Sequence, residues 1–271
     1  MLFTAPLPSR IEFSGASVEY VRLGSGPPLL YLHGFDGVSP DDPFLARLAD
    51  HFDVVAPSLP GFGASTHPSW TRTVEDLAHL VQMLLRSLEL EGVVLVGASF
   101  GGWVASELAS RSTEGLSCLV LADAVGARFS RDPLEREIVD VFTVPTNRYP
   151  ALLFADGEVA ASAFRSRDFD SLTDEALVRF CTNREGLTRF GWAPLLHDPG
   201  LSQRLGFVDV PTLVLWGAED EIVSADYGRR FAAAIPASRF EIVAGAGHYM
   251  TIEQPDEFEA RVVSFVTGGE H

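Results

Sequence analysis

Residues 93–102, VVLVGASFGG, pass from a short apolar run directly into a Gly-x-Ser-x-Gly motif centred on Ser99. The run has the length and valine content of a buried strand, and the pattern of residues 100–110 predicts a helix. A tight turn from a strand into a helix lifts a serine hydroxyl above the edge of a sheet, and small flanking residues avoid clashes in that turn. The motif therefore predicts Ser99 as a nucleophile.

The same alternation of short apolar runs and helical patterns extends over most of the chain. It predicts the α/β fold class, with a mostly parallel sheet that helices cover on both faces. Ser14-Gly15 separates the first two strands and indicates an antiparallel hairpin. The predicted strands cover residues 10–13, 18–23, 28–32, 53–56, 93–96, 116–122, 212–216 and 239–243. The predicted helices around them cover residues 44–49, 74–88, 100–110, 225–234 and 256–266.

The strand pattern stops between residues 126 and 208, where helical patterns take over. We interpret this segment as a helical lid inserted into a core formed by residues 1–125 and 209–271. Most of its apolar side chains are expected to join the lid to the core. A minority should contact substrate, and we expect Phe142 and Trp192 among them. The predicted lid helices cover residues 133–142, 157–165, 173–181 and 184–196.

A serine nucleophile needs a general base, and His248 has the best position among the seven histidines. It lies in a loop after a predicted strand and before the last helix. His33 also follows a strand. Because His33 directly precedes Gly34 in a turn, we expect it to brace the neighbouring loop by hydrogen bonds instead of acting as the base.

The imidazole must be held in one tautomer by an acceptor at its second nitrogen, so a carboxylate at a strand end is required. Asp220 follows the predicted strand at 212–216 and is our choice. Asp123, at the end of the strand at 116–122, remains the alternative. The chain order Ser99, Asp220, His248 is the order expected of a serine triad on this type of sheet.

The oxyanion of a tetrahedral intermediate needs preorganised hydrogen-bond donors. One predicted donor is the backbone N–H of Phe100, the residue after the nucleophile. The other comes from the loop after the third strand, His33-Gly34-Phe35-Asp36-Gly37, where the N–H of Phe35 is the expected donor. We also expect the Phe35 side chain to form a wall of the substrate pocket.

Five motifs together resemble the α/β-hydrolase superfamily, in its serine-nucleophile branch with a helical cap. They occur in the expected order at residues 31–35 (YLHGF), 60–65 (PGFGAS), 97–102 (GASFGG), 217–220 (GAED) and 247–248 (GH). The resemblance implies an eight-stranded sheet with a helical cap after the sixth strand. It also implies that no cofactor is required and that hydrolysis proceeds through an acyl-enzyme or a closely related species.

Within that superfamily, a serine at position 99 argues against dehalogenases and epoxide hydrolases, whose ester intermediate needs a carboxylate nucleophile. We predict a serine hydrolase that cleaves a small to medium, largely apolar carboxylic ester. A different class, a ligand-binding receptor that keeps the triad and turns over slowly, stays open because slow turnover leaves no motif.

Carbon–carbon bond hydrolases that act on ring-cleavage products are the second enzymatic alternative. Trp192 with Arg184 or Arg189 in the lid resembles them. Those enzymes usually carry Asn before the nucleophile and a glycine-rich loop after His-Gly. Ala98 and Phe35-Asp36 stand at those positions here, so this alternative ranks second.

The composition limits the partners of the chain. Lys plus Arg total 20 against 37 Asp plus Glu, and the net charge of −17 would repel nucleic acids and anionic membrane surfaces. The chain has no His-Glu-x-x-His motif and no cysteine pair at metal-ligand spacing, so no metal is expected.

The sequence shows neither a signal peptide nor a membrane span, and its two cysteines suit a reducing compartment, so we expect a cytoplasmic protein. A small-molecule substrate is the expected partner, and the oligomeric state stays open.

Overall fold

The structure, a computed structural model, describes residues 7–39, 41–132, 134–165 and 172–268. Its main sheet has eight strands in the order β1-β2-β4-β3-β5-β6-β9-β10. β2 pairs antiparallel with β1 and β4, and the remaining neighbours pair in parallel. The strands are β1 (Ser9–Phe13), β2 (Ala16–Gly24), β3 (Pro28–Leu32), β4 (Asp53–Pro57), β5 (Val93–Ala98), β6 (Leu116–Ala122), β9 (Thr212–Gly217) and β10 (Ser238–Val243).

The predicted α/β class, the opening hairpin and the eight predicted strands are confirmed. Continuous apolar runs located these strands, because parallel strands that are buried on both faces are apolar along most of their length. The ends of the strands differ from the prediction by at most two residues.

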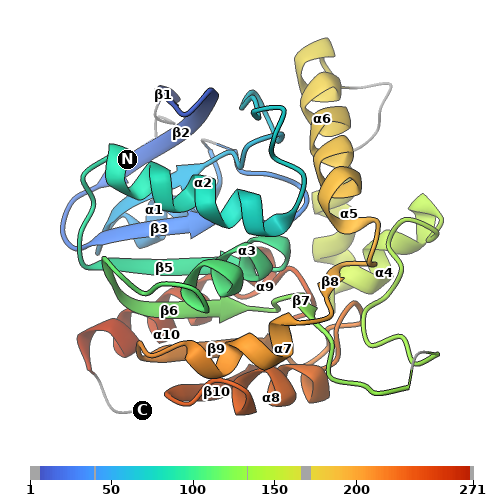
Figure 1. The fold of residues 1–271 in the computed structure, drawn as a ribbon. Coiled ribbons are helices and arrows are strands. Elements are labelled where there is room, and N and C mark those ends of the chain that lie inside the picture. The colour runs from blue at the N-terminus through green and yellow to red at the C-terminus, as the bar shows by residue number, and fades with distance from the viewer. Residues whose placement is uncertain (1–6, 40, 133, 166–171, 269–271) are drawn as a thin grey trace.

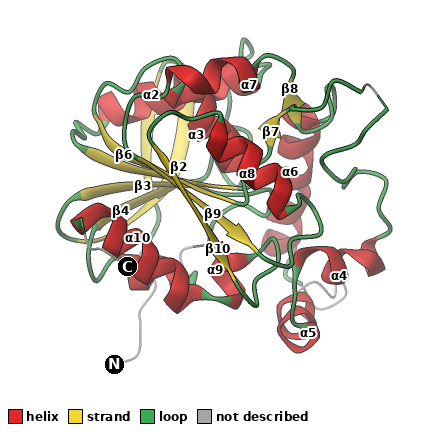
Figure 2. Cartoon of the chain, turned by 90° about the horizontal axis from the view of Figure 1, so that it is seen from below, coloured by secondary structure: helices red, strands yellow, loops and turns green. Residues whose placement is uncertain are grey.

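Helices cover both faces of the sheet and divide the core into two clusters (Figures 1 and 2). α2, α3 and α8 pack on one face, and α1 and α10 pack on the other. The helices of this part are α1 (Pro43–Leu48), α2 (Val74–Ser87), α3 (Phe100–Ala109), α7 (Leu201–Arg204), α8 (Ala225–Ala233), α9 (Met250–Glu253) and α10 (Pro255–Thr267). This packing fixes the carboxyl ends of β3, β5, β6 and β9 along one rim.

Further helices lie beyond that rim of the sheet (Figure 1). The segment that holds them starts at β7 (Gly126–Ala127) and returns at β8 (His197–Asp198), and these two short strands pair in parallel. Between them lie the 3₁₀ turn at Thr146–Arg148, α4 (Tyr149–Leu153), α5 (Gly157–Arg165) and α6 (Asp174–Gly191). The predicted helix at 157–165 coincides with α5. The two helices predicted at 173–181 and 184–196 form the single helix α6, which ends at Gly191, and α4 was not predicted.

The helix predicted at residues 133–142 is wrong for its described part, which is irregular and forms one antiparallel bridge from Ile138 to Val223. The carboxylate of Glu137 accepts the backbone N–H groups of Phe129 and Ser130, both at 2.8 Å. Within the segment, Asp132 Oδ1 accepts the N–H of Leu134 at 2.8 Å, and Asp140 Oδ1 accepts that of Phe142 at 3.1 Å. Such local side-chain bonds to the backbone compete with helix formation, and periodicity does not reveal them.

Among the described residues, no helix is long and apolar enough to cross a membrane. The first six residues, on which the expected absence of a signal peptide partly depends, lie outside the described residues.

Candidate active site

Ser99 occupies a strained turn between β5 and α3, with φ 50° and ψ −114°. Two glycines let the chain turn there without a clash. A Cβ added at Gly101 would lie 2.1 Å from the carbonyl oxygen of Leu32, and one at Gly97 would lie 2.6 Å from the carbonyl oxygen of Gly101. The helix therefore begins directly against β3, and the serine is held at the carboxyl end of its strand.

His248 lies between Ser99 and Asp220, in the loop that joins β10 to α9. Its Nε2 is 2.7 Å from Ser99 Oγ, and its Nδ1 is 2.8 Å from Asp220 Oδ2. The exposed fractions of Ser99, His248 and Asp220 are 8%, 5% and 7%. Asp220 Oδ1 accepts the N–H groups of Ile222 and Val223 at 2.7 and 3.0 Å, which fixes the carboxylate. The three predicted catalytic side chains thus form one buried hydrogen-bonded series.

Asp123 does not take the position against the imidazole. Its Oδ1 accepts the N–H of Gly217 at 2.7 Å, and its carboxyl group lies close enough to Asp220 for a side-chain hydrogen bond. The side chain is 1% exposed, and burial, followed by the negative charge of Asp220, raises the pKa of Asp123 well above its ordinary value. Asp123 is accordingly a buried acid whose neutral form is favoured, and Asp220 is the carboxylate that contacts His248.

The loop after β3 passes beside the serine, since a Cβ added at Gly34 would lie 3.4 Å from Ser99 Cβ. His33 holds this loop: its Nε2 accepts the N–H of Leu59 at 2.9 Å, and its Nδ1 lies 2.6 Å from the carbonyl oxygen of Gly34. Burial lowers the pKa of His33 to about 4, so the ring is neutral at neutral pH. The predicted bracing role of His33 is confirmed by these contacts.

The two backbone groups predicted to bind an oxyanion belong to Phe35 and Phe100. Phe100 is the first residue of α3, and the N–H groups of a first helical turn have no carbonyl partner within the helix. Phe35 directly follows Gly34 in the loop that borders Ser99, and its side chain is 4% exposed. Both residues are therefore next to the nucleophile, at the end of β3 and at the start of α3.

Two cavities include Ser99 and His248 in their lining. The first, which we call the apolar cleft, has room of about 10 Å³, about the least that one water molecule needs. Besides Ser99 and His248, its lining consists of Phe35, Phe100, Val125, Val141, Leu153, Leu187, Leu196 and Ile222.

The second cavity, which we call the larger chamber, has a volume of about 380 Å³. It lies on the side of α1 and α9, and the loop after β3 contributes Asp36 and Asp42 to its lining. Tyr31, Asp123 and Tyr249 are further members of that lining. Ser99 therefore borders a nearly filled apolar cleft and a larger chamber whose lining includes carboxyl groups.

The structure does not bring Phe142 and Trp192 into either cavity. Their rings contact each other edge to face with centroids 5.3 Å apart, and Trp192 is 57% exposed. Neither residue lines a cavity that contains Ser99, so their contact with substrate stays a prediction. Phe35, in contrast, lines the apolar cleft as expected.

The family model for the alpha/beta hydrolase fold matches residues 27–255, which include Ser99, Asp220 and His248. The chain belongs to the α/β-hydrolase family. The motifs at which the sequence resembled this family lie at the strand ends that meet at Ser99.

Known relatives of this α/β hydrolase have several different names. It is 30% identical to a dihydrolipoyllysine-residue acetyltransferase component of the acetoin cleaving system of Cupriavidus necator, over 95% of this chain and 68% of that protein. It is 25% identical to 2-hydroxy-6-oxo-6-(2'-aminophenyl)hexa-2,4-dienoic acid hydrolase of Metapseudomonas resinovorans, over 95% of this chain and 90% of that protein. An esterase from Rhodococcus sp. ECU1013 shares the fold with a TM-score of 0.72 and 23% identity, over 98% of this chain and 100% of that chain.

Asn183 of α6 is a residue near the site that the sequence analysis missed. It is 4% exposed, and its Nδ2 donates to the carbonyl oxygen of Asp36 at 2.5 Å. Its Oδ1 accepts the N–H of Gly63, in the turn at residues 60–65, at 2.8 Å. An asparagine one turn before the buried Leu187 could have been recognised as a polar residue on the apolar side of the helix. Asn183 thus joins α6 to two loops of this α/β hydrolase.

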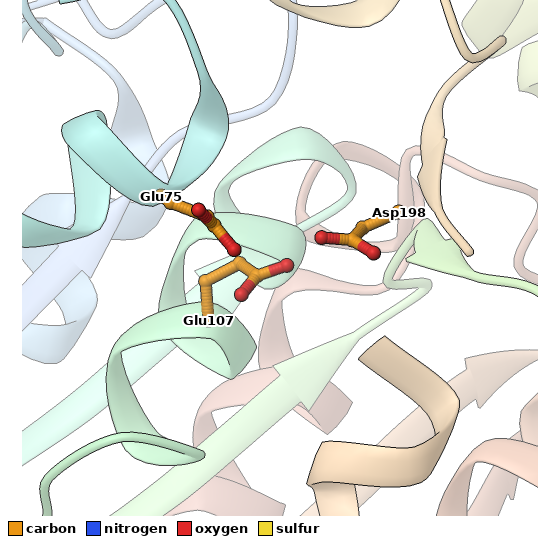
Figure 3. Close-up of side chains that lie close together, drawn as sticks. All are labelled: Glu75, Glu107 and Asp198. Atoms are coloured by element: carbon orange, nitrogen blue, oxygen red, sulfur yellow. The ribbon is translucent and has the colours of Figure 1, made fainter. Parts of the chain in front are cut away.

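Three carboxylates gather away from Ser99, where Glu75 of α2, Glu107 of α3 and Asp198 of β8 point toward one another (Figure 3). Arg204 Nη2 lies 2.8 Å from Glu107 and 2.9 Å from Asp198, and Arg111 pairs with Glu75 and Glu107. These guanidinium groups supply the compensating positive charge. The cluster is therefore an ion-pair network, and we assign it no metal.

Proposed function

We propose that this protein is a serine hydrolase that cleaves a carboxylic ester with a small to medium, largely apolar acyl group. The observation that carries the proposal is the placement of His248 between Ser99 and Asp220, with hydrogen-bond distances of 2.7 and 2.8 Å. This arrangement is what a serine nucleophile needs, because a base must take its proton and a carboxylate must hold that base in one tautomer.

In the proposed reaction, Ser99 Oγ attacks the ester carbonyl while His248 Nε2 takes its proton. The N–H groups of Phe35 and Phe100 bind the oxyanion, and Asp220 stabilises the imidazolium. The imidazolium then protonates the leaving alkoxide, which leaves an acyl group on Ser99. A water molecule, deprotonated by His248, attacks that acyl group and releases the acid.

Residues 126–208 act in this proposal as a cap on the core formed by residues 1–125 and 209–271. Val141, Leu153, Leu187 and Leu196 of that segment line the apolar cleft, so they would surround the acyl group and keep bulk water from the reacting carbonyl. Because the cleft has room for about one water molecule, even a short acyl chain would require the cap to shift slightly, and longer chains would require a larger shift.

Carbon–carbon bond cleavage of a dienol-keto acid is the second candidate, and the named relative from Metapseudomonas resinovorans supports it. Arg184 lies with its guanidinium carbon 5.9 Å from the centre of the Phe35 ring, and this cation favours an acidic substrate. Against it, Ala98 stands where those enzymes usually carry Asn, and Phe35-Asp36 stand where they usually carry a glycine-rich loop. Ester hydrolysis is therefore the better supported proposal.

The decisive experiment is a chain-length series of p-nitrophenyl esters, from acetate to decanoate, with the wild type and Ser99→Ala side by side. We expect wild-type turnover to be greatest for short acyl chains. In Ser99→Ala it should fall to a residual rate, lower by about 10⁴-fold or more, that comes from binding and the oxyanion donors.

Circular dichroism must show that Ser99→Ala is folded. Undiminished turnover in that variant would contradict the assignment of the nucleophile. Feeble hydrolysis of every ester by a folded wild type would instead favour the dienol-keto acid, to be assayed next by loss of its colour, or a ligand-binding role, to be assayed by ligand-dependent thermal stability.

A further inference from the structure

The oxyanion donor proposed at Phe35 lies in a tight turn at residues 34–37. The N–H of Gly37 donates to the carbonyl oxygen of Gly34 at 3.3 Å and closes this turn. In a turn closed from its first to its fourth residue, the N–H of the second residue takes no part in the closure. Among the described residues, the N–H of Phe35 has no acceptor. Its use as a donor therefore depends on how the turn is held beside Ser99.

Asn183 of α6 is connected to that N–H through two peptide groups. Its Nδ2 donates to the carbonyl oxygen of Asp36 at 2.5 Å, and the peptide group that carries this oxygen also carries the N–H of Gly37. The N–H of Gly37 in turn binds the carbonyl oxygen of Gly34, which shares a peptide group with the N–H of Phe35. Because each peptide group is planar, the bond from Asn183 restrains the direction of the Phe35 N–H. Consecutive hydrogen bonds also polarise one another, which strengthens the last donor.

The amide of Asn183 is itself held in one orientation. The side chain is 4% exposed, and its Oδ1 accepts the N–H of Gly63 at 2.8 Å. With an N–H on one side and the carbonyl of Asp36 on the other, only this orientation of the amide satisfies both groups. A Cβ added at Gly37 would lie 2.6 Å from Asn183 Nδ2, so the side chain packs directly against the turn. His33 thus holds the turn from the core, and Asn183 holds it from α6.

We propose that Asn183 is a positioning residue for the oxyanion donor of Phe35. The inference rests on the proposed ester hydrolysis and adds to it a residue of the segment between β7 and β8. In this role α6 stabilises the transition state and does more than supply a wall of the apolar cleft. Loss of one oxyanion donor costs about 10²- to 10³-fold in rate, and a donor that is poorly held should cost part of that.

The test changes the amide of Asn183 and measures hydrolysis of p-nitrophenyl butyrate. Asn183→Asp keeps an oxygen for the N–H of Gly63 and loses the donor to Asp36, so we expect kcat/KM to fall by about 30-fold. Asn183→Ala removes both groups but leaves space for water, and we expect a loss of about tenfold. Arg179→Met is the matched control, because it breaks the ion pair that joins the same helix to Glu19, at 3.0 Å, and should change kcat/KM by less than about twofold.

A pair of ketones separates oxyanion positioning from a general structural role. In 1,1,1-trifluoro-2-hexanone the carbonyl carbon is attacked by Ser99 Oγ, whose proton passes to His248 Nε2. The electron pair of the carbonyl bond moves onto its oxygen, which becomes the oxyanion. The methyl ketone 2-hexanone has the same chain and is far less prone to this addition. Affinity for the trifluoro ketone should fall in Asn183→Asp by about the same factor as kcat/KM, whereas affinity for 2-hexanone should change by less than about twofold.

The outcomes distinguish this inference from the proposed function. Circular dichroism must show that the variants are folded. Unchanged kcat/KM, an equal loss of affinity for both ketones, or an equal loss of activity in Arg179→Met would each overturn the inference and leave the esterase intact. If the wild type cleaves no ester, the ketones still test Asn183. A preference for the trifluoro ketone that decreases in Asn183→Asp and Asn183→Ala supports the inference, and an unchanged or absent preference overturns it.

Discussion

At the scale of single residues, the site includes groups whose backbone conformation or burial carries a free-energy cost. Ser99 keeps a backbone conformation that side chains rarely adopt, with φ 50°, and Asp123 has φ 47° at the end of β6. Asp220 and Asp123 are two buried carboxyl groups near each other, and they differ in their partners. Asp220 has His248 and two backbone N–H groups, whereas Asp123 has the N–H of Gly217. The environment of Asp123 thus raises its pKa and favours its neutral form.

The first residue-scale prediction compares Asp220→Asn with Asp123→Asn. Asp220→Asn should lower kcat on a p-nitrophenyl ester by about 10³- to 10⁴-fold, because a neutral amide cannot stabilise the imidazolium of His248. Asp123→Asn should lower it by less than about tenfold, since the environment already favours the neutral form of the side chain it replaces. Equal losses, or a larger loss in Asp123→Asn, would show that Asp123 is the acid that supports the histidine.

The second residue-scale prediction concerns pH and stability. Because the pKa of Asp123 is raised in the folded protein, the native state holds a proton that the unfolded chain releases above about pH 4. The contribution of Asp123 to the free energy of unfolding is therefore largest at low pH. It falls as pH rises toward the folded pKa, by up to about 1.4 kcal/mol per pH unit.

Asp123→Asn has no proton to lose, so its free energy of unfolding should increase relative to that of the wild type between about pH 5 and pH 8. Urea unfolding at several pH values measures this difference. Asp226→Asn, whose side chain is exposed, serves as the control. Parallel pH profiles for wild type and Asp123→Asn would mean that Asp123 is ionised in the folded protein.

At the scale of elements, loops and helices from distant parts of the chain determine the shape of the site. The loop after β3 and the start of α3 bring Phe35 and Phe100 to the nucleophile. Asn183 of α6 forms hydrogen bonds both to that loop and to the turn at Gly63. The irregular segment around Val141 fills the apolar cleft, although a helix was predicted there.

The element-scale prediction is that Val141→Ala moves the preferred acyl chain to a longer one, by about one or two carbons. Val141 is 4% exposed and lines the cleft, so removal of two methyl groups adds space for the acyl group. The p-nitrophenyl ester series measures the change. Val139→Ala, two residues away and outside the cleft lining, should keep the wild-type preference. An unchanged optimum in Val141→Ala would show that the acyl group binds elsewhere.

At the scale of the whole molecule, the segment between β7 and β8 must be fastened where it leaves and rejoins the sheet. Pairing of β7 with β8 does part of this. The ion-pair network of Figure 3 does more, because Arg204 of α7 reaches Glu107 of α3 and Asp198 of β8. Glu107 has no exposed side-chain surface, and burial raises its pKa, so its charge depends on these partners.

The prediction at this scale is that Arg204→Met lowers the free energy of unfolding by about 2 kcal/mol, because Glu107 loses a charged partner in a buried position. Arg111 still contacts Glu107, which limits the loss. Urea unfolding at neutral pH measures it. Arg229→Met, which breaks an exposed pair with Asp226, should change stability by less than about 1 kcal/mol. Equal effects of the two substitutions would contradict a stabilising role for the network.

The sequence by itself determined the sheet, its opening hairpin and the fold family, because buried strands and the turn at Ser99 leave local patterns of apolar residues and glycines. It also indicated Ser99, His248 and Asp220 as candidates by their places after strands. Only the tertiary structure decided that Asp220 and not Asp123 lies against His248, since both residues follow strands and differ only in what packs around them. It likewise decided which side chains line the two cavities. Phe142 and Trp192 have the composition of a pocket wall, yet the direction of a side chain in an irregular insertion depends on contacts between residues far apart in the chain, which local periodicity does not record.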